Sequence, residues 1–137
     1  MVQQGRIVAF AVLSEEAPSC TSPELIARVL GRFPGVTHHA CVNAHGPVFS
    51  ACMEHTSLPH LLEHVVVELQ AQHVQRFVQE RGVLPAGVRE DFAFVGATEW
   101  VGQGRRRARI SVNFTDDIVA LRAFSEAIEY LNGLLLS

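Results

Sequence analysis

The alternation of apolar and polar positions along the chain predicts extended and helical segments in succession. Residues 6–13 are apolar and include several β-branched side chains, which predicts a first strand. Ser22, Pro23 and Glu24 then supply an N-cap, a first-turn proline and a favourable acidic residue. Apolar residues repeat at helical spacing after this cap until Gly35. The first strand is therefore expected to lead into a helix.

A hairpin and a long helix are predicted next. Two extended segments, residues 36–42 and 48–53, flank a polar turn that contains the residue types required by hairpin loops. Thr56 or Ser57 can cap a helix that runs over about residues 59–81 and ends before a glycine. This helix is the longest element that the sequence predicts.

Two further strands and a last helix complete the predicted fold. The strands are expected over residues 91–101 and 107–114, and residues 115–117 cap a helix with one apolar side. The order β-α-β-β-α-β-β-α predicts an α+β fold, a two-layer sandwich in which helices cover one face of a mostly antiparallel sheet. The 137 residues are expected to form a single domain, 1–137, around one core.

Composition excludes several classes of protein. With 48% hydrophobic residues, 18% charged residues and a formal net charge of -3, the chain is not a disordered tail, a collagenous repeat or a coiled coil. All 11 basic residues are Arg, and the absence of Lys excludes a P-loop lysine and Schiff-base chemistry. No stretch approaches the roughly 18 apolar residues of a membrane helix, so no membrane partner is expected.

The cysteines point to a compartment rather than to a site. Three cysteines without C-x-x-C spacing argue against a disulfide framework and against a cysteine zinc knuckle. We therefore expect a reducing compartment, the cytoplasm. Cys41 near His39, and Cys52 near His55, could be imagined as nucleophile and base, but no orienting Asn or Asp is evident, and small buried core thiols are the simpler interpretation.

One basic cluster lies next to a glycine-rich turn and contains Arg107 and Arg109. Because the net charge is negative and no basic helix is present, no nucleic-acid partner is expected, and a solvated hairpin tip is the default interpretation. The alternative is that these guanidinium groups bind a carboxylate of a substrate. The apolar residues 134–136 would suit a homodimer contact if they are exposed.

Histidines form the most unusual feature of the sequence, because all 7 fall between positions 38 and 73. His60, Glu63 and His64 make an H-x-x-E-H motif, and on a helix that advances about 100° per residue their side chains share one stripe. Two imidazoles one turn apart can bind a zinc ion, and a carboxylate between them can take a proton from the metal's water. This inverted form of the zinc-hydrolase motif predicts a metal site on the long helix.

The surroundings of the motif suggest the rest of the site. Glu63 is expected within an apolar arc of the helix, where burial would raise its pKa toward the range of a general base. A third metal ligand must come from elsewhere. Glu68 lies on a side of the helix that is expected to be solvated, whereas Glu99 lies on a later strand that could face the helix, which slightly favours Glu99. His39 and His45, near the predicted hairpin, are the other candidates.

A stretch of the long helix resembles a known family. Residues 60–70, HLLEHVVVELQ, resemble an E-H-x-x-x-E-L-Q helix in the N-terminal domain of cyanophycin synthetases, where the helix also begins with His. A His-x-Cys pair at positions 39–41 and a His-Gly pair at positions 45–46 are similar to pairs of that domain. The strand 108–114 with its acidic cap and Ala-rich helix is similar in layout. The resemblance covers roughly residues 24–132 and implies a stand-alone version of the domain.

The resemblance also implies a partner. Cyanophycin is a poly-aspartate backbone with an arginine on each side chain. In the synthetases this domain accompanies two ATP-using ligase domains, and it is thought to bind the polymer and, in some members, to cut it as a metal-dependent hydrolase. A peptide or a cyanophycin-like polymer is therefore the implied partner of this chain.

Two hypotheses follow. The first is a zinc-dependent hydrolase of amide or peptide bonds, in which His60 and His64 bind the metal, Glu99 or Glu68 completes the site and Glu63 is the general base. The residues expected to support these ligands or to contact the substrate are His39, His45, Arg107 and Arg109. The second hypothesis is a non-catalytic module for polymer binding, peptide binding or assembly, which keeps the fold and has its histidines hydrogen-bonded in the core.

Overall fold

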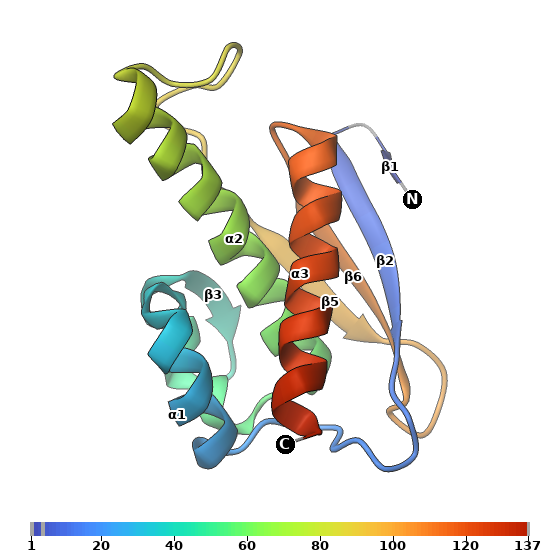
Figure 1. Ribbon diagram of the computed structural model, residues 1–137. Helices are drawn as coiled ribbons and strands as arrows, with labels where there is room; N and C mark the ends of the chain where they lie inside the picture. Colours follow the sequence, from blue (N-terminus) through green and yellow to red (C-terminus); the bar gives the residue numbers. More distant parts are fainter. Residues whose placement is uncertain (1, 4, 137) are drawn as a thin grey trace.

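A four-stranded antiparallel sheet forms one layer of the computed structural model, which describes residues 2, 3 and 5–136. The strands stand in the order β1-β2-β6-β5 (Figure 1). They are β1 (Val2–Gln3), β2 (Arg6–Val12), β5 (Gly96–Trp100) and β6 (Arg107–Asn113). The pairing of β2 with β6 sets Ile7 opposite Val112 and Ala9 opposite Ile110, and these side chains form the sheet's contribution to the core.

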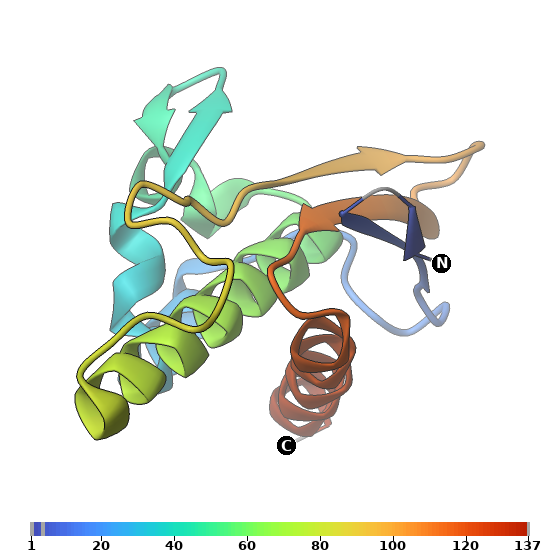
Figure 2. The ribbon, with the colours of Figure 1, turned by 90° about the horizontal axis from the view of Figure 1, so that it is seen from above.

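Helices cover one face of this sheet. The helices of the described residues are α1 (Pro23–Arg32), α2 (Leu58–Arg81) and α3 (Asp117–Leu135). α2 and α3 pack against each other and lie on the same side of the sheet (Figure 2). The arrangement confirms the predicted α+β fold, with β1 as an additional strand. Within the described part of the chain, no helix combines the length and the apolar character that a membrane crossing requires.

Side-chain caps start the helices where the sequence predicts. Ser22 Oγ accepts a hydrogen bond from the Leu25 N–H at the start of α1. Ser57, rather than Thr56, caps α2 by accepting from the His60 N–H. α2 ends at Gly82, whose φ of 72° lies in the left-handed region that favours glycine. These local signals set the position of the H-x-x-E-H motif in the first turns of α2.

The first half of α2 is buried on all sides. Every residue from position 61 to position 67 is buried, including Glu63 and His64 at 3% exposure each. The helix is enclosed by β5, β6 and α3 on one side and by the 3-10 helix Pro34–His38 on another. A helix that is apolar around most of its circumference is typical of such an enclosed position. Because this part of α2 is enclosed, Glu63 and His64 of the motif are buried in the interior.

The hairpin is shorter than predicted. β3 (Ala40–Asn43) pairs with β4 (Gly46–Val48), whereas the sequence predicted strands over residues 36–42 and 48–53. The flanking residues instead form short 3-10 helices: Pro34–His38, Phe49–Ala51 and Met53–His55. Val36 and Phe49 are fully buried from these turns, so their apolar character reflects burial rather than a strand.

β5 also begins later than predicted, at Gly96 instead of position 91. The side chain of Asn113 takes the place of regular pairing in this region. Its Oδ1 accepts from the Val95 N–H at 2.8 Å, and its Nδ2 donates to the Ala93 C=O at 2.9 Å. The segment before β5 is therefore fixed beside β6 without belonging to the sheet.

Candidate metal centre

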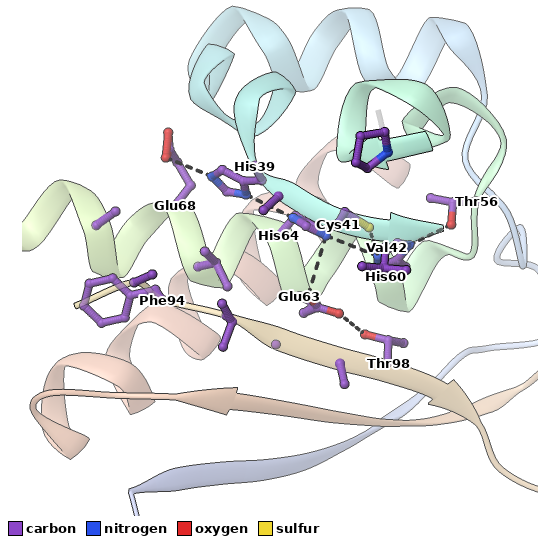
Figure 3. A pocket seen from close by; sticks show the side chains of 18 of the residues that line it. His39, Cys41, Val42, Thr56, His60, Glu63, His64, Glu68, Phe94 and Thr98 are labelled. Carbon is purple, nitrogen blue, oxygen red and sulfur yellow. Dashed lines mark hydrogen bonds and ion pairs between the residues drawn. The ribbon is translucent and has the colours of Figure 1, made fainter. Parts of the chain in front are cut away.

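The H-x-x-E-H stripe of α2 faces a pocket of about 920 Å³ between β3 and the segment that leads into β5 (Figure 3). His60, Glu63 and His64 all line this pocket. Their side chains converge from a single helix because positions i, i+3 and i+4 lie on one face. The helix face that carries the H-x-x-E-H motif therefore forms one wall of the pocket.

A third donor comes from β3. Cys41 Sγ lies 3.4 Å from His60 Nε2, and His64 Nε2 lies 3.2 Å from His60 Nε2. The sulfur and one nitrogen of each histidine all lie within 4.8 Å of one another, so Cys41, His60 and His64 form a group that can hold a metal ion. Cys41 packs against the core as a half-buried rather than a fully buried thiol, and its sulfur lies beside His60.

The spacing of these donors fits a small four-coordinate ion. Bond lengths of about 2.05 Å to nitrogen and 2.3 Å to sulfur in a tetrahedron give edges of about 3.3 Å between two nitrogens and about 3.6 Å between nitrogen and sulfur. The two observed distances, 3.2 and 3.4 Å, are close to these edges. One thiol and two imidazoles are also donors that zinc prefers.

Glu63 lies beside the donor atoms. Its Oε2 is 3.6 Å from His64 Nε2, and its Oε1 accepts a hydrogen bond from the Thr98 hydroxyl at 2.7 Å. Burial raises the pKa of Glu63 from its ordinary value of 4.5 to about 7, although the Thr98 hydrogen bond and the nearby His39 act in the opposite direction. A carboxyl group with this pKa can both accept and return a proton near neutral pH.

A chain of hydrogen bonds fixes the orientation of His64. His39 Nδ1 lies 3.0 Å from His64 Nδ1, and His39 Nε2 lies 3.2 Å from Glu68 Oε1. Because a carboxylate only accepts, a neutral His39 donates from Nε2 and accepts at Nδ1, and His64 then donates from its own Nδ1. The lone pair of His64 Nε2 then faces Cys41 and His60, as a metal ligand requires.

His60 is held from two sides. Thr56 Oγ1 lies 2.8 Å from His60 Nδ1 and can accept its proton, which leaves Nε2 free for the cluster. The Phe49 ring stacks on His64 with centroids 3.8 Å apart and meets His60 edge-on. Both imidazoles are therefore positioned by packing as well as by hydrogen bonds.

Burial keeps both imidazoles neutral. It lowers the pKa of His64 to about 2, with further lowering by the neighbouring His60 and His39, and it also lowers the pKa of His60. The 3.6 Å contact between Glu63 and His64 is therefore not an ion pair. Neutral imidazole is the form that binds a metal.

Removal of Glu68 or His39 is expected to weaken zinc binding about 10- to 100-fold, because each supports a ligand without touching the metal. Titration with a chromophoric zinc chelator measures the affinity of Glu68→Ala and His39→Ala. The double variant should bind no more weakly than His39→Ala, because both residues act through one chain of hydrogen bonds. Unchanged zinc affinity in both single variants would contradict this role. Glu80 is exposed on the same helix, so Glu80→Ala serves as the control and should leave the zinc affinity unchanged.

Glu63 is expected to make the stability of the metal-free protein depend on pH. The folded-state pKa of Glu63 is about 7, above its ordinary value of 4.5. Between pH 4.5 and pH 7, Glu63 therefore releases its proton in the unfolded chain but keeps it in the folded one, so the free energy of unfolding falls as pH rises. Glu63→Gln should therefore raise the free energy of unfolding above pH 7 by on the order of 3 kcal/mol and change it little below pH 4.5.

Urea unfolding with a chelator present, near pH 4.5 and at pH 8, measures this difference. His64 acts on both proteins alike: its lowered pKa makes stability fall as pH drops below 6.5. Exposed Glu80→Gln should show no gain at either pH. An equal gain for Glu63→Gln at both pH values would contradict the assigned pKa.

The structure keeps the other predicted residues away from the cluster. Glu99 lies on the face of β5 opposite Thr98, is 67% exposed and comes within 3.9 Å of Arg109, so it does not complete the site. Arg107 lies over the Phe10 ring on the exposed side of β2 and β6. His45 is exposed in the β3–β4 turn. None of these four residues lines the pocket.

Glu68 is placed differently from its predicted solvated position. Its side chain is 14% exposed and contacts His39. Gly35 makes room for it, because a Cβ at this position would overlap the Glu68 carboxylate. Sequence reasoning missed Thr98 and Phe49, which carry no motif, and the only available signal for Cys41 was its place two residues after His39.

The comparison with protein families covers nearly the whole chain. A family model described as cyanophycin synthase-like N-terminal domain matches residues 7–134. No curated protein and no solved structure gives a match. The matched region contains the three candidate ligands and Glu63.

Proposed function

Because the chain belongs to the family of cyanophycin synthase-like N-terminal domains, we propose that it is a zinc-dependent hydrolase of peptide or amide bonds. The ligands in this proposal are Cys41, His60 and His64, and Glu63 is the general base. The observation that carries the proposal is the position of Glu63 Oε2 beside the donor cluster, 3.6 Å from His64 Nε2.

The donor set favours a catalytic rather than a structural zinc site. Structural zinc sites have four protein ligands, whereas catalytic sites have three and leave one position for water or substrate. A zinc ion held here would supply a more acidic water molecule and would polarise a substrate carbonyl. The pocket beside the cluster would admit a substrate to a metal held there.

Glu63 would move the proton in this reaction. Its Oε1 is fixed by Thr98, which leaves Oε2 directed at the cluster. As a carboxylate, Glu63 can accept a proton from water and return it to the leaving amine. Only 3% of Glu63 is exposed, which limits the access of bulk water to its carboxyl group.

Family membership and charge support the choice of substrate. We propose a cyanophycin-like polymer or an arginine-containing peptide. Glu63 and Glu68 are the acidic residues among the described ones that line the pocket, and no arginine lines it. A substrate with basic side chains would suit this lining better than an acidic one.

Metal analysis and a cleavage assay test the proposal together. Freshly purified protein is expected to contain about one zinc per chain, and chelation should abolish the release of Asp–Arg fragments from cyanophycin, followed by chromatography. Cleavage that persists unchanged in metal-free protein would contradict the metal's role. Failure to bind zinc after reconstitution would contradict the proposal as a whole.

A specific observation favours a second candidate, a binding module in which the histidines are structural. The same hydrogen bonds can be satisfied without a metal if His60 donates from Nε2 to His64 Nε2, and no buried side-chain N or O atom in the described residues lacks a partner. This module would bind the polymer without cutting it. Binding of cyanophycin that is insensitive to chelation, together with no cleavage, is the result that would identify it.

A further inference from the structure

The outer edge of β5 is open. β5 is the last strand of the four-stranded sheet, and within residues 2, 3 and 5–136 no strand pairs with its second edge. The residues on either side of β5 both bond toward β6: the Val95 C=O accepts from the Asn113 N–H, and the Val101 N–H donates to the Arg107 C=O. These two bonds fix which main-chain groups of β5 face outward.

In an antiparallel pair, residues that exchange hydrogen bonds alternate with residues that do not. With Val95 and Val101 bonded to β6, the register directs the main-chain groups of Ala97 and Glu99 to β6 as well. The N–H and C=O groups of Gly96 and Thr98 therefore point to the open edge. Gly96 and Thr98 also line the pocket of the candidate metal centre.

The open edge runs close to the proposed general base. The Thr98 hydroxyl bonds to Glu63, and a Cβ added to Gly96 would come within 2.8 Å of Glu63 Cγ and 2.9 Å of Glu63 Oε2. Glycine at position 96 thus allows the strand to approach the carboxylate closely. In Figure 3, β5 lies between β6 and the labelled site, so its open edge faces the cluster.

We propose that the substrate is an extended peptide that binds as an added strand on the open edge of β5. Its main chain would exchange hydrogen bonds with Gly96 and Thr98, the mode by which an edge strand captures a peptide. An added strand lies about 4.8 Å from its neighbour, which places its amide groups along the pocket beside Glu63. Among the described residues, Glu68 lines the pocket and no arginine does, so a peptide with neutral or basic side chains suits this lining better than an acidic one.

This inference rests on the proposed function for its choice of substrate, but it is tested without catalysis. Chelator-treated, metal-free protein labelled with ¹⁵N is titrated with acetyl-(Ala-Arg)₃-amide. The amide signals of Gly96 and Thr98 are expected to shift most. The matched peptide acetyl-(Ala-Glu)₃-amide is expected to bind at least about tenfold more weakly, because Glu68 in the pocket repels its carboxylates.

N-methylation of the peptide supplies the decisive comparison. Peptides methylated at the alanine nitrogens and peptides methylated at the arginine nitrogens should differ, since an added strand bonds to its neighbour through every second residue. One set should lose about tenfold in affinity, and the other should change less than about twofold. Equal losses in both sets, or shifts confined to residues away from β5, would overturn the proposal.

The results separate this inference from the proposed function. Edge binding without any hydrolysis would leave the inference standing and contradict the hydrolase. Hydrolysis with no perturbation of Gly96 and Thr98 would contradict the edge site and leave the hydrolase standing. No detectable binding of any peptide up to millimolar concentration would overturn the edge site.

Discussion

Cys41→Ala is expected to lower the affinity for zinc by more than about 100-fold, a larger loss than removal of a residue that only supports a ligand. The Cys41 sulfur lies 3.4 Å from His60 Nε2. Cys41 stands on β3, whereas the other two donors of the cluster, His60 and His64, stand on α2. Zinc content after dialysis, with competition against a chelator of known affinity, measures the loss.

The exposed Cys20 provides the matched control, because Cys20→Ala removes a thiol that lies outside the cluster. Its zinc affinity should equal that of the unmodified protein. Zinc affinity that survives Cys41→Ala within about threefold would show that the two histidines recruit a different third ligand. Cobalt substitution adds a spectroscopic check, since a thiolate ligand gives an intense charge-transfer band that Cys41→Ala should abolish.

Glu63→Gln is expected to retain zinc and to lower the rate of hydrolysis about 10²- to 10⁴-fold, the usual contribution of a general base. Glutamine has nearly the same shape as glutamate and can still accept the Thr98 hydrogen bond, but its amide cannot take a proton from water. The rate constant kcat for release of fragments from the polymer, measured with the zinc content of each sample, tests this expectation.

Thr98→Val separates positioning from proton transfer. The Thr98 hydrogen bond lowers the pKa of Glu63, so its loss should move the acidic limb of the pH–rate profile to higher pH while zinc content stays constant. Exposed Glu80→Gln on the same helix should leave the profile unchanged. Full activity in Glu63→Gln at normal zinc content would contradict the assignment of the base.

The part of the site that the sequence could predict is the part that lies on one helix. His60, Glu63 and His64 share a face because helix geometry is local, and Ser57 and Gly82 set the limits of that helix. The burial of Glu63 was likewise predicted from the apolar residues around it. These inferences needed no knowledge of which element packs against which.

The third ligand could not be predicted, because it depends on tertiary contacts. Cys41 reaches the cluster from β3. This strand is short because the residues on either side of the hairpin form 3-10 helices, although their apolar pattern predicted strands. Glu99 was favoured over Glu68 because its side of the strand could face α2. Successive side chains of a strand point to opposite faces, so an error of one residue reverses this prediction. Thr98 is the residue of β5 that faces the helix, one position before Glu99.

α2 divides into two parts that should differ in their rates of amide hydrogen exchange. The turns that carry His60 and His64 are enclosed, whereas the last residues of the helix, from position 78 to position 81, are exposed. Enclosed helical amides exchange only when much of the fold opens, while exposed end turns fray. We therefore expect the turns that carry the two imidazoles to exchange more slowly than the last turn of the helix. A metal held by the imidazoles would leave through the pocket between β3 and β5, and local unfolding of the helix would contribute little to its exchange.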